Sequence, residues 1–283
     1  METCGPLTSK RGEPSDEDFF FPYHCLITDI ADHMDFCQRT FAARRRTRIS
    51  LYSHRRFRVI AKENDIVRTL YTKSIVGQGK KAGLKFDEDW ENADIQAGPL
   101  PALFLAKAAS NIDINPVELD LFLGSHQPIT PTNSFEGIQI EKFESLLSTK
   151  EPVFYKDPNS GIETAMFPDF ASAMACVTCH NEHPDSPKTD WVKDEVMGAT
   201  TWSYPKSMVT EEEFISIISA VRASFEFAYL SYLTEIETFD RKPEIGTQWP
   251  SAESYSIPDL DTFMSKFRSA ADSATLNQLL SSK

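Results

Sequence analysis

The sequence lacks several features that would each assign the chain to a broad functional class. No apolar run approaches the roughly 18–20 residues needed to cross a bilayer, so we expect no transmembrane segment. The net charge of −13 reflects a deficit of basic residues and argues against nucleic acid as a partner. Gly77 and Gly79 are not followed by the GK[ST] ending of a phosphate-binding loop. No cyclase, kinase or hydrolase signature occurs, and we therefore expect that the chain is not an enzyme.

The N-terminal segment also lacks the pattern of a secretory signal peptide. Lys10 and Arg11 are followed by a largely acidic stretch, and the apolar residues after it are interrupted by Pro22 and His24. The localisation is therefore unknown from the sequence. Residues 1–18 are rich in glycine, proline, serine and charge, which predicts a disordered N-terminus.

The chain has only five cysteines, which do not suggest a disulfide framework. Two of them lie in the motif Cys176-Val-Thr-Cys-His180, and this spacing attaches a c-type haem. Cys176 and Cys179 would each add across one vinyl group of the porphyrin. His180 would then bind the iron from the proximal side. We therefore predict haem c as the cofactor, with His180 as the protein ligand of the iron.

This motif has three other interpretations: a zinc site, a dithiol redox pair and a loop without function. Cys176 and Cys179 could bind zinc with His180 or His183, but structural zinc usually draws on two ligand pairs separated by a longer loop. A dithiol redox pair is expected to follow a strand and to open a helix, whereas two prolines shortly after the motif predict a loop. The third interpretation is a buried loop whose cysteines have no function. Haem attachment accounts best for the residue types and their spacing.

Apolar periodicity and turn residues divide the rest of the chain into helices and a small sheet. Spacings of three or four predict one long helix from Leu26 to about Gly83. A basic block within it, residues 44–62, is interpreted as a solvated face rather than a patch for lipid or an acidic partner. Further helices are predicted over residues 102–110, 135–148 and 260–280, and over about seven turns after a capping box at Thr210. Strands are predicted over residues 152–155, 163–167 and 195–204, and residues 111–135 are predicted to be mostly loop. This order predicts an α+β fold.

The segment from Cys176 to Trp191 resembles the haem-attachment segment of a family of PAS-like c-type haem sensor domains. That family occurs as the input domain of bacterial nucleotide cyclases, sensor kinases and chemoreceptors, and as a stand-alone cyanobacterial haem protein. The likeness extends upstream through Gly98-Pro-Leu-Pro-Ala102 and covers about residues 60–205. It implies a PAS-like antiparallel sheet with N-terminal helices that form a haem pocket. The domains expected are a disordered N-terminus (1–18), an N-terminal helical extension with the basic segment (19–59), the PAS-like haem domain (60–205) and a C-terminal helical extension (206–283).

The resemblance also implies roles for single residues. Cys176 and Cys179 are the thioether sites and His180 is the axial ligand. His183 and Trp191 match the family motif and are expected to shape the pocket or its loop. A hydrogen-bonded loop histidine is an equally open interpretation of His183.

Two departures from the family pattern affect the expected haem environment. The arginine of a turn that follows the tryptophan in the family is replaced by Met197, so any salt bridge from it is lost. The stand-alone relative resembles a haem protein whose second ligand is a cysteine thiolate from an early helix. The candidates for the sixth ligand in this chain are Cys37, His33, Met34 and His54, or no residue at all.

These patterns predict a covalent c-type haem-binding protein that acts as a redox or gas sensory module without its own catalytic domain. A change in haem ligation would pass to the flanking helices, and from them to a protein partner or a second copy in a homodimer. Two other functions stay open: an electron-transfer haem subunit of a redox assembly, and a structural protein that has lost haem. Haem attachment implies the periplasm or an organelle lumen, although no signal peptide is evident.

Overall fold

The computed structural model describes residues 51–280. The expectations for the N-terminal 50 residues lie outside the described residues. These are the disorder of residues 1–18, most of the helical extension, and the candidate ligands Cys37, His33 and Met34. The described residues belong to one compact unit.

A long helix opens the described chain and ends at a glycine. It consists of α2 (Ser53–Leu70), a π-helical segment η1 (Tyr71–Gly77) and α3 (Gln78–Ala82). Gly83 has a φ of +93°, and its N–H caps the last turn by donating to the carbonyls of Gly79 and Lys80. A left-handed residue at this position favours glycine, which has no Cβ to strain. The helix predicted up to about Gly83 is therefore confirmed over its described part, and Gly77 and Gly79 do not break it.

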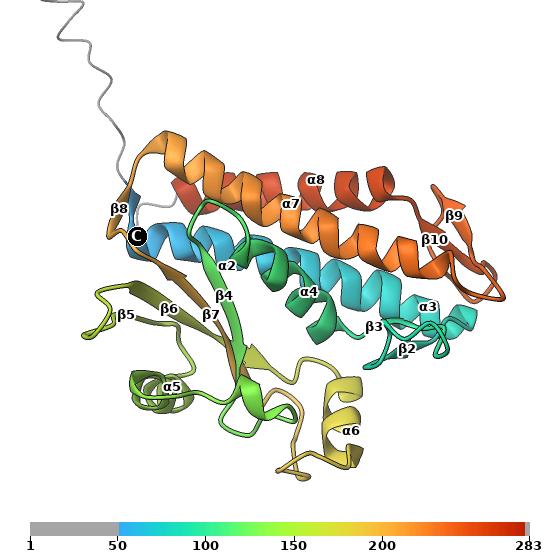
Figure 1. Ribbon diagram of the computed structural model, residues 1–283, viewed down its shortest axis with the longest axis horizontal. Helices are drawn as coiled ribbons and strands as arrows, with labels where there is room; N and C mark the ends of the chain where they lie inside the picture. The colour runs from blue at the N-terminus through green and yellow to red at the C-terminus, as the bar shows by residue number, and fades with distance from the viewer. Residues whose placement is uncertain (1–50, 281–283) are drawn as a thin grey trace, which may run out of the picture. The chain divides into compact units, whose positions relative to one another are not determined.

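Three more helices pack with α2 in one layer (Figure 1). They are α4 (Pro101–Asp113), α7 (Glu211–Ile236) and α8 (Leu260–Leu280). The capping box predicted at Thr210 is present, since its hydroxyl accepts from the Glu213 N–H and the Glu213 carboxylate accepts from the Thr210 N–H. Short strand pairs connect these helices: β1 (Leu51–Tyr52) with β8 (Met208–Val209), β2 (Phe86–Asp87) with β3 (Gly98–Pro99), and β9 (Glu244–Gly246) with β10 (Ser256–Pro258).

Among the described residues one helix, α7, is long and apolar enough by length and composition to cross a membrane. The sequence analysis expected no such run. The core explains the composition of α7, because Phe225, Tyr229 and Tyr232 are fully buried against the other helices. A central helix in a globular fold passes the same test of length and composition, so this helix is weak evidence for a membrane span.

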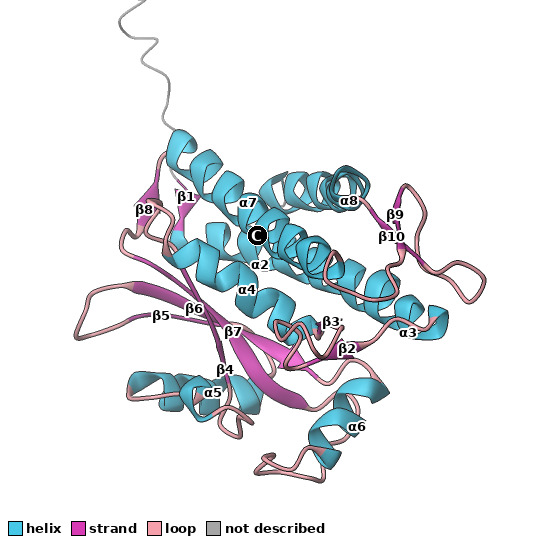
Figure 2. Cartoon of the chain, turned by 45° about the vertical axis from the view of Figure 1, so that its right-hand side comes forward, coloured by secondary structure: helices cyan, strands magenta, loops and turns pink. Residues whose placement is uncertain are grey.

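Below the helical layer lies a four-stranded antiparallel sheet (Figures 1 and 2). Its order is β4-β7-β6-β5, with a further helix, α5, on its other face. The elements are β4 (Asp120–Gly124), α5 (Ile138–Thr149), β5 (Val153–Lys156), β6 (Glu163–Phe170) and β7 (Val196–Tyr204), with a 3₁₀ turn, η2 (Pro131–Asn133), after β4. Neighbouring residues of β6 alternate between the two faces: Ala165 joins the main core under the helices, and Met166 joins a second cluster with α5.

The α+β class predicted from the sequence is confirmed, with 50% helix and 19% strand. The predicted strands correspond to β5, β6 and β7. Residues 111–135 are mostly loop, as predicted, but the prediction missed β4 within them. β4 spans only five residues and pairs with β7 about 80 residues later, so its stabilising partner is invisible to a local pattern. The helices α7 and α8, expected as an extension, belong to the same core as α2 and α4.

Candidate haem-attachment site

The CxxCH motif lies on a helix, α6 (Met174–Glu182), between β6 and β7. The prolines after the motif do lie in a loop, residues 183–195, but the motif itself is helical, which was not predicted: the helix ends at Glu182 and Pro184 follows it. A strand followed by a helix is the local structure that a dithiol redox pair was expected to have. The local structure therefore does not exclude a dithiol redox pair.

The helix presents the three motif residues on neighbouring turns. Cys176 and Cys179 are three residues apart, and His180 follows Cys176 by four, so all three lie near one side of α6. Both thiols are free; Cys176 is half-buried and Cys179 is exposed. Two free thiols and an imidazole on one side of a helix are what attachment to adjacent edges of a porphyrin and its iron requires.

A small hydrophobic cluster holds α6 against the end of the sheet. Ala171, Val177 and Trp191 are buried in it, with Cys176 and Met197 packed against them. Val177 stands between the two cysteines in sequence and points inward, which leaves the Cys179 side of the helix facing out. The residue predicted to shape the pocket, Trp191, thus lies under the helix that bears the motif.

Trp191 also contacts the predicted axial ligand. The ring centroids of His180 and Trp191 are 6.4 Å apart at 84°, an edge-to-face arrangement. The His180 Nδ1 atom is buried without a hydrogen-bond partner. Burial lowers the pKa of His180, against an opposing effect of Asp169. The neutral imidazole that this favours is the form that binds a metal.

Charged side chains from distant segments border the motif. Arg68 on α2 makes an ion pair with Asp169 at the end of β6, and its charge interacts with Cys176. Lys80 and Glu88 act in opposite directions on Cys179, whose pKa is raised mainly by desolvation. A raised pKa keeps this thiol protonated at neutral pH.

His183 uses both of its ring nitrogens in hydrogen bonds. Its Nδ1 accepts from the Asp185 N–H at 3.1 Å, so Nε2 carries the proton in the neutral ring and donates to Glu88 at 3.0 Å. Only 12% of the His183 side chain is exposed, against 55% for Glu88. This geometry favours the hydrogen-bonded loop histidine, which joins the end of α6 to the segment after α3.

His54 does not lie near the motif. Its ring packs on Phe154 of β5 at a centroid distance of 4.4 Å. Arg68, which borders the motif, follows His54 on α2 by 14 residues, or about 21 Å along a helix. His54 is therefore too distant to be the sixth ligand in this arrangement. The other three candidates lie outside the described residues.

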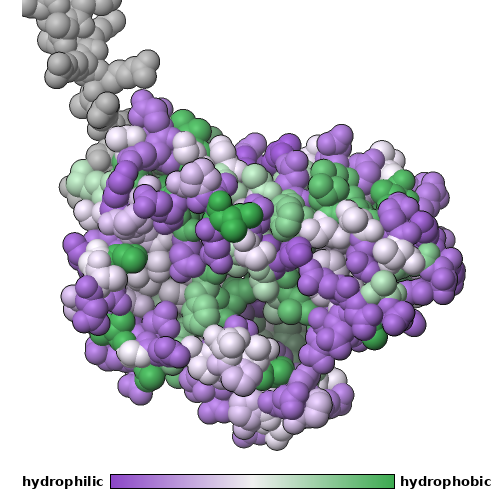
Figure 3. All heavy atoms as spheres, in the orientation of Figure 1, coloured by the Kyte–Doolittle hydropathy of each residue, from purple (hydrophilic) through white to green (hydrophobic). Residues whose placement is uncertain are grey.

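The α6 segment comprises the end of β6 and the stretch from there to β7, residues 169–195. A hollow on the face shown in Figure 3 separates the helical layer from this segment. Apolar residues are visible at its sides. The interactions of Arg68 with Asp169 and of Glu88 with His183 join the helical layer to the α6 segment.

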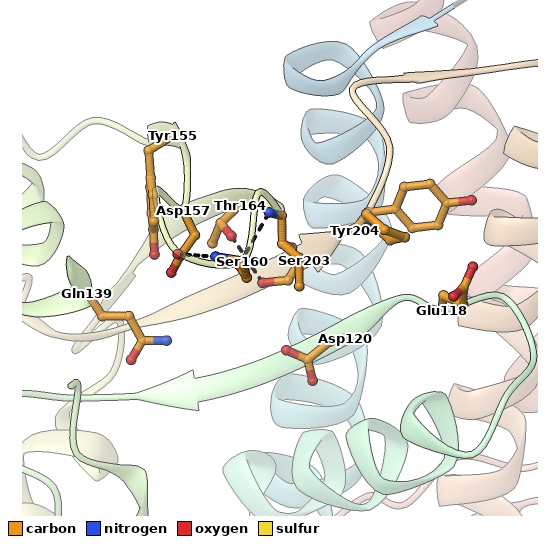
Figure 4. A pocket seen from close by; sticks show the side chains of 11 residues that line it. Glu118, Asp120, Gln139, Tyr155, Asp157, Ser160, Thr164, Ser203 and Tyr204 are labelled. Carbon is orange, nitrogen blue, oxygen red and sulfur yellow. Dashed lines mark hydrogen bonds between the residues drawn. The ribbon is translucent and has the colours of Figure 1, made fainter. Parts of the chain in front are cut away.

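Two cavities lie elsewhere on the sheet, and no motif residue lines either of them. One, of about 340 Å³, opens at the end where Asp120, Ser203, Thr164 and Tyr155 form one row across the four strands (Figure 4). Burial, followed by repulsion from Asp113, raises the pKa of Asp120 to about 6. The other cavity, of about 360 Å³, lies beside α5. Neither was predicted, since each combines residues from separate elements.

Four residues near the motif or Trp191 come from distant parts of the sequence and were not predicted: Arg68, Lys80, Glu88 and His126. The His126 ring lies 6.2 Å from the Trp191 ring, so Trp191 contacts two histidine rings. Among the described residues no group of three or more His, Cys, Asp or Glu could hold a metal ion, and the zinc alternative gains no support. Haem iron would need only one protein ligand from the motif, and the neutral imidazole of His180 could supply it.

Comparison of the chain with protein-family models, with curated proteins and with solved structures gives no match.

Proposed function

We propose that this chain is a covalent c-type haem protein that serves as a PAS-like sensory module for redox state or a diatomic gas. Cys176 and Cys179 would form the two thioethers, and His180 would bind the iron. When bound, the haem would supply a redox centre or a site for a gas ligand. The single observation that carries the proposal is the placement of two free thiols and the His180 imidazole near one side of α6.

The surroundings of α6 are suited to report a change at the iron. The Arg68–Asp169 ion pair links the base of α6 to α2, and the His183–Glu88 hydrogen bond links its end to the segment after α3. A shift of His180 would therefore reach the helical layer through two polar contacts. The α+β layout, with an antiparallel sheet under a helical layer, supports the PAS-like part of the proposal. Any output would need a partner, because no catalytic motif accompanies the site.

An electron-transfer role is the second candidate. It is favoured by the exposure of Cys179, which would leave one porphyrin edge open to a redox partner, and by the acidic net charge. An electron carrier is expected to be low-spin, six-coordinate and indifferent to carbon monoxide. A gas sensor is expected to shift its absorption band when the gas is added.

Haem staining after denaturing electrophoresis tests the proposal, using protein expressed with a cytochrome c maturation system. We expect stain that survives denaturation in the wild type and disappears in a Cys176→Ser/Cys179→Ser double variant. A Cys25→Ser variant is the matched control for loss of a thiol outside the motif, and it should stain like the wild type. An unstained wild-type band would overturn the proposal and favour a scaffold without haem.

A further inference from the structure

The side chain of Asn181, the residue after the predicted axial ligand, makes two hydrogen bonds to the backbone of Trp191. Its Oδ1 accepts from the Trp191 N–H at 2.8 Å, and its Nδ2 donates to the Trp191 carbonyl at 3.0 Å. The side-chain amide of Asn181 thus pairs with both backbone groups of Trp191, as a residue in a neighbouring β-strand can do. These bonds join α6 directly to the loop that leads into β7, across ten residues of sequence.

This pair of bonds fixes the ring contact that orients His180. Trp191 is 2% exposed, and its ring meets the His180 ring edge-to-face at 6.4 Å. Asn181 is adjacent to His180 on the helix, so the position of the Trp191 backbone relative to α6 is set one residue away from the imidazole. Among residues 51–280 the His180 side chain makes no hydrogen bond, and its Nδ1 atom is buried and unpartnered. The imidazole is therefore oriented by packing on Trp191, and Trp191 is held by Asn181.

We propose that Asn181 is a positioning residue, which holds Trp191 against the His180 imidazole and so fixes the orientation of that imidazole for axial ligation. This inference rests on the proposed function for its role toward iron. Its structural part, the orientation of His180 by Asn181 through Trp191, does not require haem. A metal-ligating histidine needs its ring plane fixed by surrounding contacts, because the iron–nitrogen bond weakens when the ring tilts.

Two variants separate the two hydrogen bonds of Asn181. Asn181→Asp keeps an acceptor for the Trp191 N–H but loses the donor to the Trp191 carbonyl. Asn181→Ala loses both bonds. Thr178→Ala, an exposed position on the same helix, is the matched control. The covalent haem content should be the same in all four proteins, since both thioether cysteines remain.

The first readout is the iron–histidine stretching band of the ferrous protein in resonance Raman spectra. We expect a lower frequency in Asn181→Ala, an intermediate one in Asn181→Asp, and the wild-type value in Thr178→Ala. The second readout needs no haem. In the protein without haem, the ring protons of His180 are shifted by the ring current of Trp191, and this NMR shift should shrink in Asn181→Ala but not in Thr178→Ala.

The outcomes distinguish this inference from the proposed function. A wild-type protein without covalent haem contradicts the proposed function, while the NMR shift still tests whether Asn181 orients His180. Wild-type values of both the Raman band and the NMR shift in Asn181→Ala would overturn the inference and leave haem attachment standing. Circular dichroism would show whether Asn181→Ala has lost its fold. In that case the Raman band and the NMR shift of Asn181→Asp test the inference instead.

Discussion

The helical layer and the α6 segment are held together in different ways. In the layer, α2, α4, α7 and α8 share one large core that includes fully buried aromatic side chains. The α6 segment has a cluster of three buried residues, Ala171, Val177 and Trp191. It is also joined to the helical layer by the Arg68–Asp169 ion pair and the His183–Glu88 hydrogen bond. Hydrophobic burial stabilises in proportion to area, so the layer is the stable scaffold. The segment that bears the candidate chemistry can therefore open without loss of the scaffold.

The layer also contains a buried ionic network that α6 does not have. The fully buried carboxylate of Glu63 accepts two hydrogen bonds from Arg222, at 2.8 and 2.6 Å, and one from Thr275 at 2.6 Å. Three helices, α2, α7 and α8, are joined through this one carboxylate. Removal of a partner would leave a buried charge without compensation, and this is the strongly destabilising change for such a network.

The largest effect is expected from Arg222→Met. It leaves the buried Glu63 carboxylate without its cation, which should lower the free energy of unfolding by about 3–5 kcal/mol. Urea denaturation followed by circular dichroism measures the loss. The control is Arg268→Met, whose exposed partner Glu226 lies at 2.9 Å and whose removal should cost less than about 1 kcal/mol. Equal losses in the two variants would mean that the buried network does not anchor the layer.

Trp191→Ala tests the other side of the comparison. Removal of the indole from the small cluster should destabilise the α6 segment by about 3 kcal/mol. Hydrogen exchange measured by mass spectrometry should show faster exchange in α6 peptides and unchanged exchange in α7. Trp249→Ala, which removes a ring packed on Phe263 in the layer, should show the reverse. If α6 and α7 lose protection together in Trp191→Ala, the two regions unfold as one unit.

Thr210→Ala probes the end of the longest helix of the layer. It removes the side-chain acceptor of the capping box, and we expect a loss of about 1 kcal/mol in the free energy of unfolding. Thr210→Ser keeps the hydroxyl and should retain most of the stability. Because α7 is part of the main core, this loss should appear in the global transition. A loss confined to local exchange at the helix end would show that α7 frays independently of the core.

The smallest effect is expected at Asp120, at the end of the sheet remote from α6. Its pKa in the folded protein is about 6, above the ordinary value, so the folded protein holds a proton that the unfolded chain releases. Stability is therefore lost as the pH rises toward 6, and Asp120→Asn should be more stable than wild type above pH 6 but not near pH 4. The carboxyl is partly desolvated beside the cavity, but Asp120 as a whole residue stays exposed, so solvent screens its charge and the gain should stay below about 1 kcal/mol.

A carboxylate with the opposite shift serves as the control for Asp120. Hydrogen bonds from the Ser160 and Asn159 backbone N–H groups lower the pKa of Asp157. Asp157→Asn should therefore be less stable than wild type at neutral pH, and the difference should vanish as the pH falls through the lowered pKa. Thermal melts across the pH range measure both variants. The same direction of change in both would contradict the assigned electrostatics.

The local patterns of the sequence were enough for most elements of the fold. The helices after Gly98 and Thr210, the helix that ends near Gly83 and three of the four main strands follow from periodicity and caps, because those signals depend on nearby residues. Strand β4 was not predicted, because its partner strand β7 lies far along the chain. The local structure of the motif was also predicted wrongly, because the prolines that end α6 were interpreted as marking a loop.

By itself the sequence determined the type of chemistry that the chain can offer, since two thiols and an imidazole at fixed spacing are a covalent property of Cys176, Cys179 and His180. Only the tertiary structure decided what surrounds them. It brought Arg68 from α2 and Asp169 from β6 to the base of α6, buried one nitrogen of His180 against Trp191, and kept His54 far away. The physical reason is that such contacts join residues distant in sequence, and their energies depend on burial and distance that no local pattern contains.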